Sequence, residues 1–474
     1  MLKFLLKLLA ALAIAAPCAA ATFTVTSNAD TAGASCAATC TLRQAITAAN
    51  ATGASDTINF NVATGGTDVL IQPATPLPLI TQPLIIDGYT QGDASVNTAV
   101  SGSNAELRVR LHGAAIATTS VAGFSACASA VSIRGLSITG FTTTGSAAIR
   151  SGGGGCATAT QVSVLGNFIG LRTDGITADA NFGGVEANGA IVHVGSANLA
   201  DRNVIGSTTQ AAISIINTGA SGSSASNNLI GSSRLGDAAR PVGRGIVLGL
   251  TVGNASIGTL AAPNVIANVA DGVGVFVANG SNNLATANRF HGLSMPVDLS
   301  VAAVGTVTAN DLDDIDTGPN GLQNFPVIQS VQRITGGVRV QGTLDVPAAS
   351  NNAPYTLSFY ANTACAASGN GPGERFLGNF PANFTQGSGE SFSIDVLTQD
   401  LLPTGTVLTA AVTGPEGSSE FSSCAAVPAG TAGFVVTTTG VATGSSCGGA
   451  CTLIQAINAA NARCLLYTSP SPRD

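Results

Sequence analysis

A four-residue motif of Asn, an apolar residue, Ile and Gly recurs at regular distances along the middle of the chain. Successive copies are separated by 36, 25, 36 and 24 residues, so copies taken two apart are 61, 61 and 60 residues apart. The copies read NFIG, NVIG, NLIG, NVIA and NRFH, and they begin at Asn167, Asn203, Asn228, Asn264 and Asn288. A unit this small cannot bury a core of its own, so such repeats fold only by stacking on one another.

The segments between the motifs alternate apolar residues with small or polar ones, which is typical of strands with one buried face. Examples are AISII from Ala212, GIVLGL from Gly245 and GVGVFV from Gly272. Several short strands in a period near 24 residues predict an all-β fold, a right-handed parallel β-helix. The 60-residue regularity argues against the alternative, an array of β-sandwiches. Asn and Gly suit tight corners, and we expect stacked Asn side chains to hydrogen-bond along the solenoid.

Each end of such a solenoid exposes strand edges and an apolar interior, so it has to be capped. The segment TLRQAITAAN, which precedes the first coils, predicts a short helix that caps the N-terminal end. Its apolar side is formed by Leu42, Ala45, Ile46 and Ala49. A second copy lies near the C-terminus, since residues 23–51 and 434–462 are identical at 16 of 29 aligned positions.

The two ends of the chain differ in composition from the rest. Lys3 and Lys7, followed by the apolar stretch from Leu8 to Ala16, predict a secretory signal peptide with a small-residue cleavage site ending at Ala21. Residues 464–474, CLLYTSPSPRD, resemble the translation of a sequencing-library adapter. No apolar run of roughly 18 residues follows the signal, so no transmembrane segment is expected.

The cysteines agree with export. Without Cys18 in the signal and Cys464 in the adapter-like tail, eight of the ten remain, and they fall into local pairs. An even set in an exported chain predicts disulfides, although the spacing leaves their connectivity open. A zinc site would need four ligands that come together, and the three histidines are widely spread. The predicted disulfide cysteines are Cys36, Cys40, Cys127, Cys156, Cys365, Cys424, Cys447 and Cys451.

After the repeats, short alternating runs such as GVRVQGTL and YTLSFYA predict an immunoglobulin-like β-sandwich of about 100 residues. Repetition of the cap module beyond it predicts that the whole block recurs in a longer parent protein. The expected division is a signal peptide (1–21), a cap module (22–60), a parallel β-helix (61–322), a β-sandwich (323–427), a truncated second cap module (428–463) and adapter-derived residues (464–474).

The N-terminal sequence resembles a known module. The stretch from Phe23 through CTLRQAITAAN, DTINF and LIIDGYTQ is similar to the CSLREA-type module of secreted bacterial proteins. The NFIG and NVIG coils, with DTGPNGLQNFPVI after them, resemble the pectin-lyase-like β-helix that usually follows that module. The resemblance covers roughly residues 23–427 and implies an architecture but no reaction. Family modules carry SLREAI, whereas Gln44 and Gln455 replace the Glu here, and Ile454 replaces the Arg in the second copy.

The densest acidic cluster lies between the expected β-helix and the sandwich. The favoured interpretation is a solvated linker, because the segment lacks the twelfth-position Glu of an EF-hand loop. The alternative is a calcium site, since alternating carboxylates are the ligands that Ca²⁺ loops use. The candidate ligands are Asp311, Asp313, Asp314 and Asp316, and no cofactor other than calcium is predicted.

Two coils carry roughly 12 extra residues each, in the loops LRTDGITADANF (171–182) and SSRLGDAARPVGR (232–244). They follow equivalent motifs two coils apart, so both should emerge on one face, roughly 10 Å apart. Loops stacked on one face are a usual binding surface of a solenoid, although charges also gather wherever solvent is. The candidate ligand-binding residues are Arg172, Asp174, Arg234, Asp237, Arg240 and Arg244.

No catalytic residue is predicted. Between residues 94 and 300 no two carboxylates are adjacent or two residues apart, and His112, His193 and His291 are far from one another in sequence. A net charge of −7 argues against nucleic acid as a partner. We expect an exported bacterial protein, secreted or at the cell surface, with a structural or adhesive role and with glycans or other surface molecules as partners. The alternative is a carbohydrate-active enzyme, a polysaccharide lyase or glycoside hydrolase, that gathers carboxylates from neighbouring coils.

Overall fold

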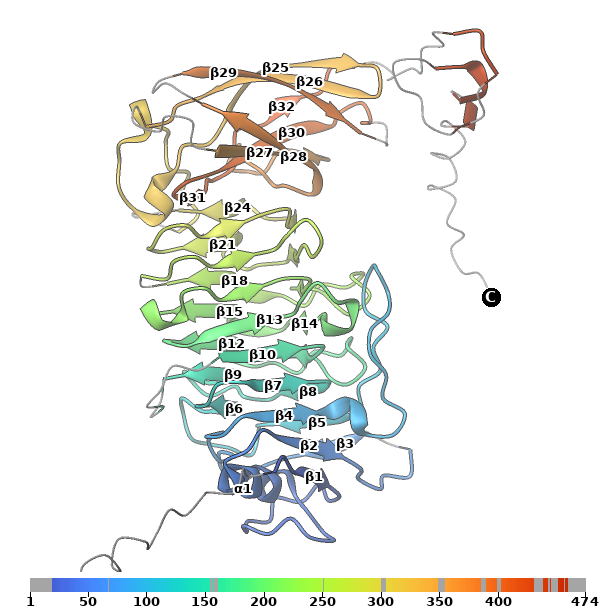
Figure 1. The fold of residues 1–474 in the computed structure, drawn as a ribbon, viewed down its shortest axis with the longest axis vertical. Helices are drawn as coiled ribbons and strands as arrows, with labels where there is room; N and C mark the ends of the chain where they lie inside the picture. The colour runs from blue at the N-terminus through green and yellow to red at the C-terminus, as the bar shows by residue number, and fades with distance from the viewer. Residues whose placement is uncertain are drawn as a thin grey trace, which may run out of the picture.

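The computed structural model describes residues 19–458, except 67, 154–155, 157–160, 250, 300–303, 348–353, 385–388, 399–401, 430–437, 442–443, 445–450 and 456. Most of the predicted signal peptide and all of the adapter-like tail lie outside the described residues. Figure 1 shows a tall stack of short strands with a helix at one end and a β-sandwich at the other.

Three parallel sheets form the walls of the stack, with nine, eight and seven strands. Consecutive stretches of the chain pass from one sheet to the next, and each strand pairs with its equivalent in the coil before and the coil after. The predicted right-handed parallel β-helix is therefore confirmed.

The nine-stranded sheet contains β1 (Thr22–Val25), β2 (Asp56–Phe60), β4 (Leu84–Asp87), β7 (Val131–Arg134), β10 (Gln161–Leu165), β13 (Ile191–Val194), β16 (Ser224–Ala225), β19 (Ser256–Ile257) and β22 (Leu284–Ala285). The eight-stranded sheet contains β3 (Val69–Ile71), β5 (Val109–His112), β8 (Leu136–Thr139), β11 (Phe168–Ile169), β14 (Val204–Ile205), β17 (Leu229–Ile230), β20 (Val265–Ala267) and β23 (Arg289–His291). The seven-stranded sheet contains β6 (Ala122–Ala126), β9 (Ala147–Gly152), β12 (Gly183–Asn188), β15 (Thr208–Ile216), β18 (Val242–Leu248), β21 (Val273–Val277) and β24 (Met295–Asp298).

The asparagines of the repeat form a continuous buried ladder, as the sequence predicts. The Nδ2 of Asn203 donates to Oδ1 of Asn228 at 2.9 Å, and the same bond joins Asn228 to Asn264 at 2.9 Å. At one end of the ladder, Nδ2 of Asn264 donates to Oδ1 of Asn288 at 2.9 Å. At the other end, Nδ2 of Asn167 donates to Oδ1 of Asn203 at 3.3 Å. All five side chains are fully buried. The ladder therefore satisfies polar groups at a corner of the solenoid that water does not reach.

The other motif positions have equally definite places. The Ile side chains, such as Ile169 and Ile205, are completely buried in the solenoid core. The residue before the Ile, such as Phe168, belongs to a separate buried cluster on the outer face of the eight-stranded sheet. Gly170 has a φ of 73°, and a Cβ there would collide with the Gly206 carbonyl of the next coil. Glycine is thus required where one coil closely approaches the next.

Helix α1 (Leu42–Thr52) closes the N-terminal end, and its apolar side packs against the solenoid core. Thr41 and Gln44 form a capping box, in which the Thr41 N–H donates to Gln44 Oε1 at 2.9 Å. The Gln44 side chain therefore caps the N-terminus of the helix. Arg43 forms an ion pair with Asp30 at 2.8 Å. The cap module also contributes β1 and β2, so stacking of the nine-stranded sheet begins within residues 22–60.

The sandwich consists of two antiparallel sheets, as expected for an immunoglobulin-like domain. One sheet contains β25 (Val327–Ile334), β26 (Gly337–Leu344) and β29 (Glu390–Leu397). The other contains β27 (Pro354–Asn362), β28 (Arg375–Asn383), β30 (Val407–Gly414), β31 (Gly417–Ser418) and β32 (Ala425–Ala426). Buried residues of both sheets, including Val340 and Leu357, form a core separate from that of the solenoid.

The sandwich closes the C-terminal end of the solenoid. Phe421 packs edge-on against Phe290 of β23, with ring centroids 5.9 Å apart, and both rings belong to the solenoid core. Asn320 accepts a hydrogen bond from the Asn283 N–H at 3.0 Å and donates to the Ser418 carbonyl at 3.0 Å. The sandwich therefore covers an apolar end that would otherwise contact water.

A buried carboxyl group at this junction predicts a pH-dependent stability. Glu420 is 2% exposed, and burial, reinforced by the nearby Asp298, raises its pKa from 4.5 to about 7. The folded state therefore binds this proton more tightly than the unfolded state, so the associated stability is present below pH 4.5 and is lost as the pH rises through about 7. We expect the Tm to fall between pH 5 and pH 8, with a loss on the order of 3 kcal/mol from this group.

The Glu420→Gln variant mimics the protonated group, so its Tm should change less over the same pH range. The matched control is Glu416→Gln, an exposed Glu in the same part of the chain, which should retain the wild-type pH profile. Because the pKa of Asp314 is also raised to about 7, Glu420→Gln is expected to flatten the profile without removing it. Identical profiles for wild type and Glu420→Gln would contradict the prediction.

Three of the expected disulfides are present, and they join the local pairs. They are Cys36–Cys40, Cys127–Cys156 and Cys365–Cys424, with sequence separations of 4, 29 and 59 residues. Cys447, one member of the remaining pair, lies outside the described residues. In the part of the chain that the structure describes, no helix is long and apolar enough to cross a membrane.

Candidate functional site

The two long loops lie side by side, as their spacing predicts. The N–H of Arg234 donates to the Gly175 carbonyl at 2.9 Å, and Arg240 Nε donates to the Ile176 carbonyl. Each loop is also closed on itself by one antiparallel bridge, Leu171 to Ala178 and Ser232 to Ala239. The loops thus form one continuous surface beside the eight-stranded sheet.

Two of the charged residues predicted to bind a ligand also make hydrogen bonds within the protein. Arg234 donates to Ala105 O at 2.7 Å and to Glu106 Oε1 at 2.9 Å, because residues 91–107 extend along the stack (light blue in Figure 1). Asp174 accepts hydrogen bonds from the N–H groups of Ile176 and Thr177, both at 2.7 Å. These contacts are internal to the protein.

The remaining candidates differ in exposure and position. Asp237 accepts a hydrogen bond from the Ser233 hydroxyl at 2.6 Å, which closes its own loop. Arg172 and Arg244 are 52% and 45% exposed, and they lie 3.7 Å from Asp179 and 3.4 Å from Asp271 respectively. Arg244 lines a hollow of the surface.

A charged cluster that the sequence does not indicate lies on the outer face of β5. Arg110 pairs with Asp179, and Nδ1 of His112 lies 3.6 Å from the same carboxylate and 3.1 Å from Thr139 Oγ1. Burial, together with the positive charge of Arg110, lowers the pKa of His112. These contacts fasten the 171–182 loop to the eight-stranded sheet.

A hollow lies on the outer face of the seven-stranded sheet, over β9, β12, β15 and β18. Its volume is about 290 Å³. Polar residues in its lining are Ser146, Glu186, Gln210, Ser214 and Arg244. Apolar residues in its lining include Phe182, Ala211, Ile216 and Val247. We call this hollow the sheet groove.

The charges around the sheet groove are compensated. Glu186 accepts a hydrogen bond from Arg150 Nη2 at 3.1 Å, and Arg244 Nε lies 3.4 Å from Asp271. The groove therefore combines hydrogen-bonding groups and apolar surface without an excess of either charge. Such a mixture suits a ligand with many hydroxyl groups and apolar C–H faces.

Glu186, Gln210 and Ser214 were not expected from the sequence. The strand partners place Glu186 beside Arg150 on one side and beside Ser214 on the other, and Ser214 beside Val247. The alternating strands indicate that these side chains point outward, but the motif spacing alone does not align them. The alternation of apolar and polar residues within each strand could have identified Glu186, Gln210 and Ser214 as outward-facing side chains.

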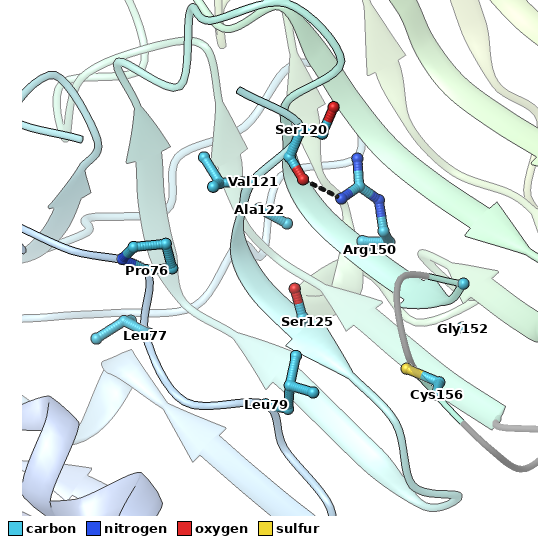
Figure 2. Close-up of a pocket in the computed structure, with 11 residues that line it drawn as sticks. Pro76, Leu77, Leu79, Ser120, Val121, Ala122, Ser125, Arg150, Gly152 and Cys156 are labelled. Carbon is cyan, nitrogen blue, oxygen red and sulfur yellow. Dashed lines mark hydrogen bonds between the residues drawn. The ribbon is translucent and has the colours of Figure 1, made fainter. Parts of the chain in front are cut away.

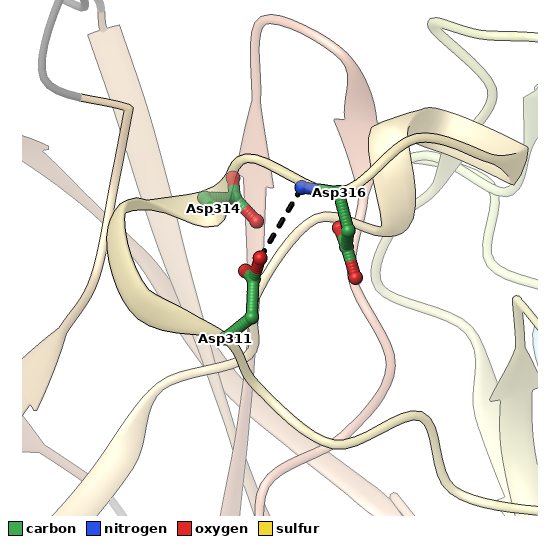
Figure 3. A group of neighbouring side chains, drawn as sticks. All are labelled: Asp311, Asp314 and Asp316. Carbon is green, nitrogen blue, oxygen red and sulfur yellow. Dashed lines mark hydrogen bonds between the residues drawn. The ribbon is translucent and has the colours of Figure 1, made fainter.

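The acidic loop brings together three of its four aspartates (Figure 3). Asp311, Asp314 and Asp316 each offer a carboxylate oxygen, and these oxygens lie within 4.8 Å of one another. Asp313 is not in this group, and its backbone has a φ of 60°. Burial, with the neighbouring charges of Asp311 and Asp316, raises the pKa of Asp314 to about 7. The carboxyl group of Asp314 is thus partly withdrawn from solvent.

Two oxygens of this loop have no hydrogen-bond partner among the described residues. They are Oδ1 of Asp311 and Oδ1 of Asp316, and both atoms are buried. The other oxygen of Asp311 accepts from the Asp316 N–H at 3.2 Å, and Asp314 accepts from Asn324 N and Gln323 Nε2, both at 2.8 Å. Unpaired buried carboxylate oxygens are costly unless a cation or a proton compensates them.

Comparison with known proteins identifies no family for the chain. No family model matches the sequence, and no curated protein matches it. Among solved structures, the crystal structure of the Dettilon tailspike protein is similar, with 11% sequence identity and a TM-score of 0.27. The alignment covers 82% of this chain and 85% of the tailspike chain. At this level the similarity carries no conclusion about function.

Proposed function

We propose that the chain is an exported β-helix protein with a structural or adhesive role at a surface, and that it binds glycans in the sheet groove. Disulfides persist in oxidising compartments outside the cytosol, so the three disulfides support export. A solenoid capped at both ends is a long and stable support for such a surface. The resemblance to CSLREA-type secreted proteins points in the same direction.

The observation that carries the proposal is the lining of the sheet groove. Arg244, Gln210 and Glu186 present donors and acceptors beside the apolar surfaces of Phe182 and Val247. A sugar ring offers hydroxyls for such donors and acceptors, and its C–H face packs on apolar and aromatic side chains. Arg244 is the exposed cation of this lining and also one of the residues predicted from the sequence.

The test compares two arginines of similar exposure on a glycan array. Arg244→Ala removes a donor from the sheet groove, and we expect binding to array glycans to weaken by about tenfold, the effect of losing one charged hydrogen bond. The matched control is Arg339→Ala, because Arg339 is 44% exposed and paired with Asp395 on the sandwich. Equal binding by both variants would contradict the proposal.

The carbohydrate-active enzyme remains the alternative, but no observation favours it. A hydrolase or lyase of this fold would need several carboxylates that come together in one groove. Glu186 is the single carboxylate among the described residues that line the sheet groove, and it is paired with Arg150. The lining therefore supports binding rather than bond cleavage.

A second function, calcium binding by the acidic loop, is favoured by its two unpartnered carboxylate oxygens. We propose that Asp311, Asp314 and Asp316 supply protein ligands to one Ca²⁺, with further oxygens from backbone or water. The role would be to brace the junction between solenoid and sandwich.

Calcium at about 5 mM, above the weak range of extracellular sites, should then raise the stability by about 2 kcal/mol. The measurement is the Tm with calcium and with a chelator. Asp316→Asn should abolish the rise, whereas Asp313→Asn, in the same loop but outside the group, should preserve it. An unchanged Tm in the wild-type protein would refute the calcium site.

A further inference from the structure

A second hollow lies on the same sheet, closer to the N-terminal cap (Figure 2). It has a volume of about 160 Å³ and lies over β6 and β9. Leu77 and Leu79, from the chain between β3 and β4, form one side of it, and Ser125 and Arg150 line it from the sheet. Cys156, whose disulfide partner is Cys127, lies at another side. We call it the cap-side hollow.

The cap-side hollow and the sheet groove adjoin across one residue. Arg150 lines the cap-side hollow and donates to Glu186, which lines the sheet groove. The guanidinium of Arg150 also donates to Ser120 O at 2.9 Å and to Gly145 O at 2.6 Å. With three partners and an exposed fraction of 12%, Arg150 is a fixed part of the floor between the two hollows.

One outward-facing row of side chains runs through both hollows. It consists of Ser125, Arg150, Glu186, Ser214 and Val247, each paired in register with the next. These residues belong to the five consecutive strands β6, β9, β12, β15 and β18. Neighbouring strands are about 4.8 Å apart, so the row is about 19 Å long and parallel to the solenoid axis.

We infer that the two hollows are two parts of one path for a linear, uncharged oligosaccharide lying along the solenoid axis. This inference rests on the proposed function and names the ligand class and its orientation. The length of the row exceeds a single sugar and corresponds to a short oligosaccharide. Hydroxyls of Ser125 and Ser214 would face sugar hydroxyls, while Leu79, which is 39% exposed, and Val247 would face C–H surfaces.

The two hollows carry no excess of positive or negative charge, which favours a neutral over an acidic oligosaccharide. The charged residues lining the two hollows are Arg150, Glu186 and Arg244. Arg150 is paired with Glu186, and Arg244 is paired with Asp271. An acidic polysaccharide would have to compete with these carboxylates for the guanidinium groups, whereas a neutral chain would not.

The experiment measures binding to an array of linear glycans in length series of one to eight sugars, neutral and acidic. We expect the wild-type protein to bind glycans of a neutral series, with an affinity that rises at least tenfold from disaccharide to hexasaccharide. The binding should change little when the salt concentration is raised, since no net charge is involved.

Ser125→Trp fills the cap-side hollow while leaving the sheet groove free, so it should remove the gain from the longer chains and leave disaccharide binding unchanged. Ser125→Ala removes the hydroxyl without filling the hollow, so it should reduce the gain from the longer chains less than Ser125→Trp does. The Tm of both variants shows whether the fold is retained. If Ser125→Trp unfolds, Leu79→Trp on the exposed wall of the same hollow takes its place.

The possible results separate the inference from the proposed function. Glycan binding that depends on Arg244 but not on chain length, or that ignores a filled cap-side hollow, overturns the inference and leaves the proposed function in place. Preference for an acidic series with strong salt dependence also overturns it. No binding to any series overturns both.

Discussion

Replacing Asn228 by Leu is expected to lower the free energy of unfolding by about 3 to 5 kcal/mol, because it interrupts the buried ladder at its centre. Asn228 is fully buried, and its Nδ2 donates to Val194 O at 2.9 Å and to Asn264 Oδ1 at 2.9 Å. Its Oδ1 accepts from Asn203 at 2.9 Å. Leu fills a similar volume but cannot form these hydrogen bonds, so the Val194 carbonyl and the side chains of Asn203 and Asn264 each lose a buried partner.

The measurement is urea denaturation followed by circular dichroism. Asn279→Ala is the matched control, since Asn279 belongs to the same solenoid but is exposed, and it should change stability by less than about 0.5 kcal/mol. If both substitutions had the same small effect, the ladder would not be a main source of cohesion between the coils.

Replacing Phe421 by Ala should cost about 3 to 5 kcal/mol and uncouple the sandwich from the solenoid. Phe421 is 2% exposed, and its ring lies 5.9 Å from that of Phe290 and 4.9 Å from that of Tyr360. The variant leaves a cavity between the last coils and the sandwich. We therefore expect a thermal transition of the solenoid that separates from that of the sandwich, together with faster hydrogen exchange in β23.

Phe384→Ala provides the comparison, because Phe384 is also 2% exposed but belongs to the core of the sandwich alone. Its loss should destabilise the sandwich by a similar amount and leave exchange in β23 slow until the sandwich unfolds. Faster exchange in β23 in both folded variants, or in neither, would show that Phe421 has no special role at the junction.

The parts of the fold that the sequence predicts are those governed by local periodicity. Alternation predicts which side chains face the core, as Ile169 and Ile205 do. The conformational tolerance of Asn and Gly predicts the corners, and the Asn ladder follows from regular stacking. The i, i+3, i+4 pattern predicts the cap helix, and its observed bounds include Leu42 and Ile46.

The candidate site was predicted only in part. The two charged loops do meet, but residues 91–107 lie against them, and Arg234 is bound to Glu106 from that segment. No periodicity signals a segment that leaves its own coil and extends along its neighbours. The acidic loop illustrates the same limit, because Asp313 is chemically identical to Asp311, Asp314 and Asp316, and only the folded loop decides which three carboxylates come together.

The amino-acid sequence by itself determines that this protein is a capped, disulfide-bonded β-helix, because coil length, core-facing residues and corners are all encoded within one repeat. The tertiary structure alone decides which outward side chains share a groove. Successive members of the row Arg150, Glu186, Ser214 and Val247 are 36, 28 and 33 residues apart, whereas the motif copies alternate between 36 and 24 or 25. Loops of unequal length and a register shift between Thr208 and Ala211 align them, and both depend on how whole coils stack.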